Sequence, residues 1–197
     1  MLWKRKDDFS DFKPDVNRAT WLKTTRLTAQ QRQRLTKWSC YVLTMVLALV
    51  IQDTILSQFR ILGATTDLVV SVILLITVLE GTEAGTAFVL PASLFYYFSG
   101  SAPSALCIAL LSILGIAATM LRQMYWHRSK GSVLLCAALA LMAYEMGLFV
   151  VGILYQLTWF GRVGSFLMTG LYSSLLLIPL YPLIYKIGLI GGNTWKE

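Results

Sequence analysis

The chain has 197 residues, of which 56% are hydrophobic and only 14% are charged, and its net charge is +7. Soluble domains carry about a quarter charged residues, so this composition excludes a water-soluble globule. The apolar residues lie in long blocks without the alternation of half-buried elements, which indicates a lipid environment. The sequence therefore predicts an all-α, polytopic membrane protein.

The first 38 residues are polar and strongly basic, and we predict a partly disordered cytoplasmic tail over 1–38. Ten of the 17 Lys and Arg residues lie in this segment. Those nearest to the first apolar block are Arg26, Arg32, Arg34 and Lys37. Cations beside a membrane segment attract anionic lipid headgroups, and no nucleic-acid-binding motif accompanies them. The tail predicts contact with membrane lipid or an acidic partner, and none with nucleic acid.

Six apolar blocks follow, and a short cytoplasmic tail is predicted over 189–197. The predicted spans are residues 39–57, 61–79, 82–98, 103–122, 132–157 and 163–187, which form one membrane domain over 39–188. The second and third blocks are the weakest, and one long helix is the alternative there. Six spans leave only Arg60 and Arg162 on the side opposite to the other 15 cations, whereas five spans divide them 11 to six. The positive-inside rule therefore favours six spans with both termini in the cytoplasm.

Small residues recur at helical spacing in several spans. They are Gly81 and Gly85 in the third span, Cys136, Ala140 and Ala143 in the fifth, and Gly161, Ser165, Thr169 and Ser173 in the sixth. Such stripes let helices approach closely in lipid. Packing of helices within the bundle is the favoured interpretation, and a docking face for another membrane protein is the alternative. The stripes alone do not distinguish the two.

Polar residues that interrupt the apolar blocks are the candidate binding residues. Glu145 lies near the centre of the fifth span, where a carboxyl group needs a protein partner. A proton or ligand site and a neutral, hydrogen-bonded structural carboxyl are both open interpretations. Gln52 and Asp53 lie near the predicted outer end of the first span, and Asp67 lies at the outer start of the second. Asp53 and Asp67 form either a paired acidic site or two interfacial groups that reach water.

Glu80 and Glu83 lie in the predicted inner turn between the second and third spans. A salt bridge with the basic tail, a cytoplasmic docking point and a solvated turn are the three interpretations of this turn. The cysteines stand apart within apolar blocks, and His127 has no clustered ligands beside it. The sequence also lacks a phosphate-binding loop and a nucleophile elbow. We therefore predict neither enzymatic activity nor a cofactor.

Several short motifs, taken in order, resemble the rod shape-determining protein MreD family of bacteria over roughly 40–188. The motifs are Gln52-Asp53-Thr54-Ile55-Leu56, Gly63-Ala64-Thr65-Thr66-Asp67-Leu68, Gly81 with Gly85, Ser99-Gly100, and the basic turn from Arg122 to Lys130. That family typically reads Q-x-T-L-L, then G-x-x-P-D-L, then a glycine-rich third span. The resemblance implies a multi-pass protein of the bacterial cytoplasmic membrane.

The resemblance also implies a non-enzymatic subunit of the machinery that elongates the peptidoglycan wall and sets cell shape. MreC-like proteins and other membrane proteins of that machinery are the implied partners. The family is similar in fold to the substrate-binding S-components of energy-coupling-factor transporters, so a vitamin-binding transporter subunit is the alternative. That class usually carries an Ala-x-x-x-Ala motif in its first span, where this chain has only Ala48. A carrier or intramembrane enzyme centred on Glu145 is a third hypothesis.

Overall fold

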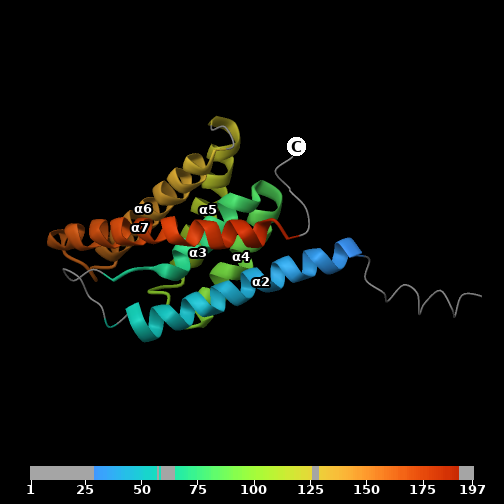
Figure 1. Cartoon of the computed structure of the whole chain (residues 1–197). Coiled ribbons are helices and arrows are strands. Elements are labelled where there is room, and N and C mark those ends of the chain that lie inside the picture. The colour runs from blue at the N-terminus through green and yellow to red at the C-terminus, as the bar shows by residue number, and fades with distance from the viewer. Residues whose placement is uncertain (1–28, 57, 59–64, 126–128, 191–197) are drawn as a thin grey trace, which may run out of the picture.

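The computed structural model describes residues 29–56, 58, 65–125 and 129–190 (Figure 1). Every regular element among these residues is helical. The elements are α2 (Ala29–Ile51), a π-helical turn (Gln52–Leu56), α3 (Leu68–Glu80), α4 (Thr82–Phe98), α5 (Leu106–Tyr125), α6 (Lys130–Leu154), a 3₁₀ turn (Phe160–Arg162) and α7 (Val163–Gly188). The predicted all-α class is confirmed for this part of the chain.

Among the described residues, four helical segments are long and apolar enough to cross a membrane. They are Ala29–Leu56, Leu106–Met124, Lys130–Leu154 and Phe160–Gly188. The first begins about ten residues before the predicted span, so residues 29–38 of the predicted tail continue the helix instead. The rest of the tail, including Arg26, lies outside the described residues.

The predicted second span is shorter than the sequence suggests. We predict a crossing helix over 61–79, but α3 has only 13 residues. At 1.5 Å per residue this is about 20 Å, against a hydrocarbon core of about 30 Å. Every residue from Leu68 to Leu79 is buried in protein, and α3 packs against α2, α4, α5, α6 and α7. Its uniform apolarity therefore reflects burial at the centre of the bundle, since such a helix needs no polar face.

The ends of α3 are completed by side chains from distant parts of the chain. The Gln52 side-chain oxygen accepts a hydrogen bond from the Val69 backbone N–H at 2.9 Å. At the other end, the Arg122 guanidinium donates to the carbonyl oxygens of Val78 and Leu79. Helix ends carry unpaired backbone groups that are costly away from water, and these two side chains satisfy several of them.

A single residue separates α3 from α4, and the two helices pack against each other. That residue, Gly81, has φ 87°, a conformation that side chains disfavour. One turn later, a Cβ on Gly85 would overlap the carbonyl oxygen of Thr77 in α3. The alternative of one long helix across these blocks is therefore wrong, and Gly85 allows close packing within the chain.

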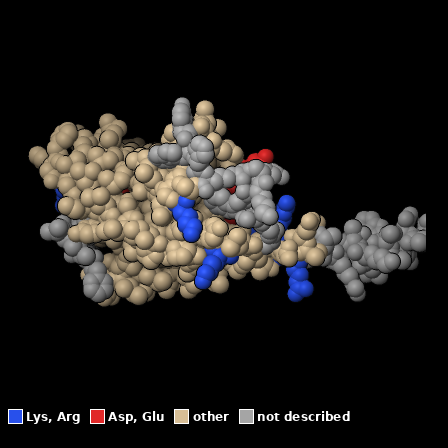
Figure 2. Space-filling view, turned by 45° about the horizontal axis from the view of Figure 1, so that its top comes forward, with Lys and Arg blue, Asp and Glu red and all other residues tan. Residues whose placement is uncertain are grey.

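The outward faces of the long helices are apolar. On α2, Leu43, Leu47 and Val50 each expose more than half of their surface, as do Leu175 and Ile178 on α7. Figure 2 shows one face of the molecule, most of which is formed by uncharged residues. Apolar surface of this extent is stable against lipid but not against water, so the chain is a membrane protein.

Candidate functional site

A cavity of about 600 Å³ lies at the end of the bundle where α3 begins and α7 starts. Its volume falls in the range of small-molecule sites, about 300–1,000 Å³. The polar side chains that line it include Asp67, Ser101, Glu145, Arg162, Ser165 and Thr169. Tyr96, Leu148 and Phe166 supply apolar walls. Four separate segments of the chain thus contribute to one polar chamber.

The carboxyl groups of Asp67 and Glu145 lie close to each other on the wall of this cavity. A hydrogen bond between them needs a proton on one of the two groups, because an ionised carboxylate can only accept. Glu145 is 2% exposed. No group in the described part of the chain donates a hydrogen bond to its Oε1 atom. The pair is therefore short of hydrogen-bond donors.

Asp67 is available for this pair because it does not cap its own helix. It occupies the N-cap position of α3, where aspartate commonly accepts a hydrogen bond from the first turn, yet it makes no such side-chain bond. Gln52 caps Val69 in its place, and the Asp67 backbone N–H donates to Ser173 Oγ at 2.9 Å. The π-helical turn after α2 and helix α7 thus satisfy the backbone at the start of α3, which leaves the Asp67 carboxyl group to face Glu145.

Glu145 owes its position to the close approach of α6 and α7. A Cβ added to Gly170 would lie 3.6 Å from Glu145 Cγ and 2.5 Å from the sulfur of Met142. A side chain at this position would have to displace the Met142 sulfur. The neighbouring Thr169 and Ser173 face the same side and are buried. Small residues of α7 thus make room for a carboxyl group inside the bundle.

Arg162 and Ser101 complete the polar lining of the cavity. Arg162, the residue before α7, lines it and is exposed. Ser101, another lining residue, donates to both carboxylate oxygens of Asp53, at 3.2 and 3.1 Å. Asp67 lies beside Glu145 on the same cavity wall, whereas Asp53 holds the loop that follows α4. These contacts do not form the paired acidic site of Asp53 and Asp67, which was one of the two interpretations of these residues.

A second polar cluster lies at the other end of α3. Lys37 Nζ is 2.7 Å from Glu80 Oε2, and both side chains are under 10% exposed. The Tyr41 hydroxyl donates to the other Glu80 oxygen. A Cβ on Gly188 would lie 3.2 Å from the Tyr41 hydroxyl, so α7 closes over the cluster. Of the three interpretations of the inner turn, the salt bridge holds for Glu80, whereas Glu83 lies in the first turn of α4 and is not buried.

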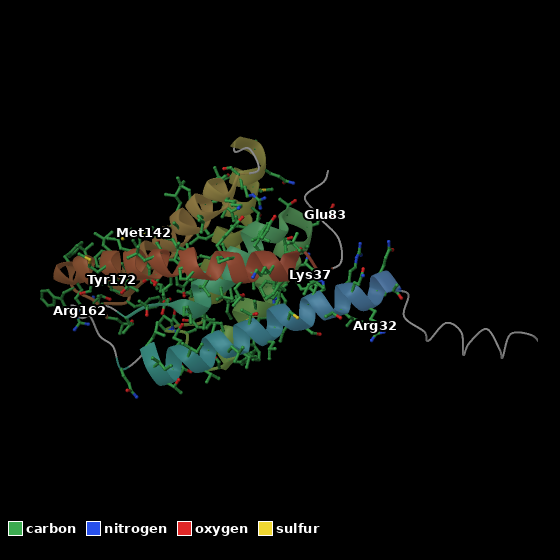
Figure 3. The ribbon with its side chains drawn as sticks, viewed as in Figure 1. Arg32, Lys37, Glu83, Met142, Arg162 and Tyr172 are labelled. Atoms are coloured by element: carbon green, nitrogen blue, oxygen red, sulfur yellow. The ribbon has the colours of Figure 1, made fainter. Side chains whose placement is uncertain are left out.

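The structure separates the predicted basic residues into two kinds. Arg32 and Arg34 are exposed near the start of α2, as a surface role requires. Lys37 is predicted at the membrane surface but is 6% exposed and ion-paired, because the helix turns it toward α3. Figure 3 shows Arg32, Lys37 and Glu83 toward one end of the bundle and Arg162 at the opposite end.

The predicted small-residue stripe of α7 faces inward along most of its length. Ser173 bonds to the backbone before α3, Thr169 is buried, and Ser165 lines the cavity. Gly161 is exposed and has no atom near its Cβ direction. Packing within the chain therefore accounts for Thr169 and Ser173, which leave no small-residue surface for a partner there.

Sequence reasoning missed several residues of these two clusters. No sequence pattern singled out Tyr41, Tyr96 or Ser101 as site residues, and Arg162 entered only through the distribution of charge. The one available signal was that Asp67 and Glu145 both interrupt apolar blocks, which requires each to find a partner in protein. No protein-family model, curated protein or solved structure matches this chain.

Proposed function

We propose that the chain is a six-span protein of the bacterial cytoplasmic membrane, with both termini on the cytoplasmic side. The four long apolar helices supply four crossings. The α3–α4 pair supplies the other two, because α3 joins the cavity end to the Lys37 end and α4 returns. The short α3 remains compatible with a crossing, since its N-terminus meets a polar cavity rather than lipid.

Within that membrane the chain acts as a non-enzymatic scaffold subunit of the machinery that elongates peptidoglycan and sets cell shape. The observation that carries this proposal is the ordered set of MreD-like motifs. Several residues of these motifs also have a structural role in the described part of the chain. Gln52 caps α3, Gly81 forms the turn, and Gly85 allows α3 and α4 to touch.

The scaffold binds MreC-like proteins and other membrane proteins of the same machinery through its helix faces. An apolar groove of about 320 Å³ runs between α5 and α6, and Ala117, Leu139 and Ala143 are among its lining residues. Such small residues permit close approach of a partner's transmembrane helix. The exposed cations Arg32 and Arg34 support contact of the α2 start with anionic lipid.

Affinity purification of the full chain from native membranes tests this function. We expect wall-elongation membrane proteins to co-purify, and Ala143→Leu, which fills the groove at an exposed position, to reduce their recovery severalfold. Val150→Leu is the matched control, because Val150 is exposed on the same helix and does not line the groove. Recovery of transport ATPases in place of wall-elongation proteins would overturn the scaffold proposal.

The polar cavity favours one second candidate, a substrate-binding membrane subunit of an energy-coupling-factor-type vitamin transporter. Its volume and its mixed polar and aromatic lining suit a small ligand. The absence of an Ala-x-x-x-Ala motif in the first span weighs against it. Co-purification of a transport ATPase together with a retained small molecule would favour this candidate over the scaffold.

A further inference from the structure

We propose that the cavity at the start of α3 binds a small zwitterion whose primary ammonium group is held by Asp67 and Glu145 and whose anionic group is held by Arg162. This inference is independent of the scaffold function, since the cavity is distinct from the α5–α6 groove. It rests on the shape, the hydrogen-bonding capacity and the charge of the cavity.

The carboxyl pair is built to accept hydrogen bonds from a ligand. Glu145 is 2% exposed, and its Oε1 atom accepts no hydrogen bond from the described part of the chain. Buried polar atoms are otherwise almost always hydrogen-bonded, and a primary ammonium group offers three donors. The fold also maintains this lack of hydrogen-bond donors. Gln52 accepts the bond from the α3 backbone, and the Asp67 side chain makes no capping bond to its own helix.

The charge of the pair matches a single cation. Two carboxyl groups that share one buried site disfavour double ionisation, so they retain one proton between them and carry one negative charge rather than two. One ammonium group neutralises that charge. A divalent metal ion would instead favour two ionised carboxylates with further oxygen ligands.

Arg162 supplies the complementary positive charge on the same cavity. It forms no ion pair with any described acidic residue, and its guanidinium can bind a carboxylate or a phosphate with two parallel hydrogen bonds. Tyr96 and Phe166 form apolar walls that suit a short hydrocarbon linker. A primary amine joined to an anionic group has the required chemistry, either as a free amino-acid-like molecule or as the headgroup of phosphatidylethanolamine.

Isothermal titration calorimetry of the purified full chain in detergent tests the proposal with γ-aminobutyrate, ε-aminocaproate and phosphoethanolamine as zwitterionic probes. Butylamine and butyrate carry only one of the two charges. We expect at least one zwitterion to bind about tenfold more tightly than both single-charge probes, because each charged contact contributes separately. Equal binding of butylamine, or no binding by any zwitterion, would overturn the proposal.

Variants then assign the two charges. Glu145→Gln keeps the side-chain volume and should weaken the best zwitterion about tenfold, whereas Arg162→Gln should reduce it to the affinity of butylamine. Glu83→Gln is the matched control, since Glu83 lies outside the cavity and toward the other end of the bundle. If Glu145→Gln fails to fold, the exposed Arg162→Gln variant still decides the matter. Unchanged affinity in Arg162→Gln would refute the assignment.

A lipid arm separates the two sources of this chemistry. In nanodiscs of phosphatidylglycerol, added phosphatidylethanolamine should compete with the soluble zwitterion if the natural ligand is the headgroup. It should leave the affinity unchanged if the ligand is a free molecule. This competition is measured with the soluble zwitterion that binds most tightly in the calorimetric experiment.

Discussion

The ion pair between Lys37 and Glu80 gives the most decisive test of the fold. We expect Lys37→Met to destabilise the protein strongly, although it keeps an unbranched side chain of similar length. The pair is 2.7 Å apart, with its side chains 8% and 3% exposed. It therefore belongs with buried pairs, for which loss of one partner costs about 3–5 kcal/mol, rather than with surface pairs, which contribute up to about 1 kcal/mol.

The lower part of this range is expected, because the Tyr41 hydroxyl still donates to Glu80 after Lys37 is replaced. A loss of about 3 kcal/mol corresponds to roughly a hundredfold change in the unfolding equilibrium. Adding Glu80→Gln to Lys37→Met should restore part of the stability, since an amide keeps an acceptor for Tyr41 and carries no unpaired charge. The double variant should therefore be more stable than Lys37→Met alone by about 1–3 kcal/mol.

Reversible unfolding by SDS in mixed detergent micelles, followed by intrinsic fluorescence, measures these differences. Arg34→Met is the matched control, because Arg34 is exposed on the same helix one turn earlier and should change stability by less than about 0.5 kcal/mol. If Lys37→Met were no worse than Arg34→Met, or if Glu80→Gln deepened its defect, the buried-pair reasoning would be refuted.

Three further predictions concern the hairpin, the cap of α3 and the topology. Gly85→Ala should destabilise the protein by about 1–3 kcal/mol, because the added methyl group overlaps the α3 backbone. The control Gly164→Ala lies in open space on α7 and should be neutral or stabilising by up to about 1 kcal/mol. Thermal denaturation in detergent compares the two variants. Gln52→Leu should cost about 1–3 kcal/mol in the same assay, because a buried N–H of α3 loses its acceptor, and an unchanged midpoint would contradict that role. In a chain without its native cysteines, an impermeant thiol reagent applied to whole cells should label Arg162→Cys and leave Lys130→Cys unmodified; labelling of both from outside would rule out the six-span orientation.

The sequence by itself determined the class of the protein and much of its helical outline. Long apolar blocks with few charges specify helices that avoid water, and α4, α5, α6 and α7 begin and end within a few residues of their predicted positions. The same reasoning singled out Asp67, Glu80 and Glu145, since an ionisable group in an apolar block needs a partner. These residues could be singled out from the sequence because an ionisable group buried in any fold needs a partner.

Only the tertiary structure decided which partners these residues have. Glu80 meets Lys37 from 43 positions away, and Asp67 lies beside Glu145 on another helix, whereas the sequence left the partners of Asp67 open. Hydropathy also overestimated the length of α3 and did not show that protein surrounds it, because an apolar side chain has the same preference for lipid as for a protein interior. Apolarity therefore shows that a segment avoids water, but not whether lipid or protein surrounds it. Packing alone therefore made α3 a short central helix and opened a polar cavity at its end.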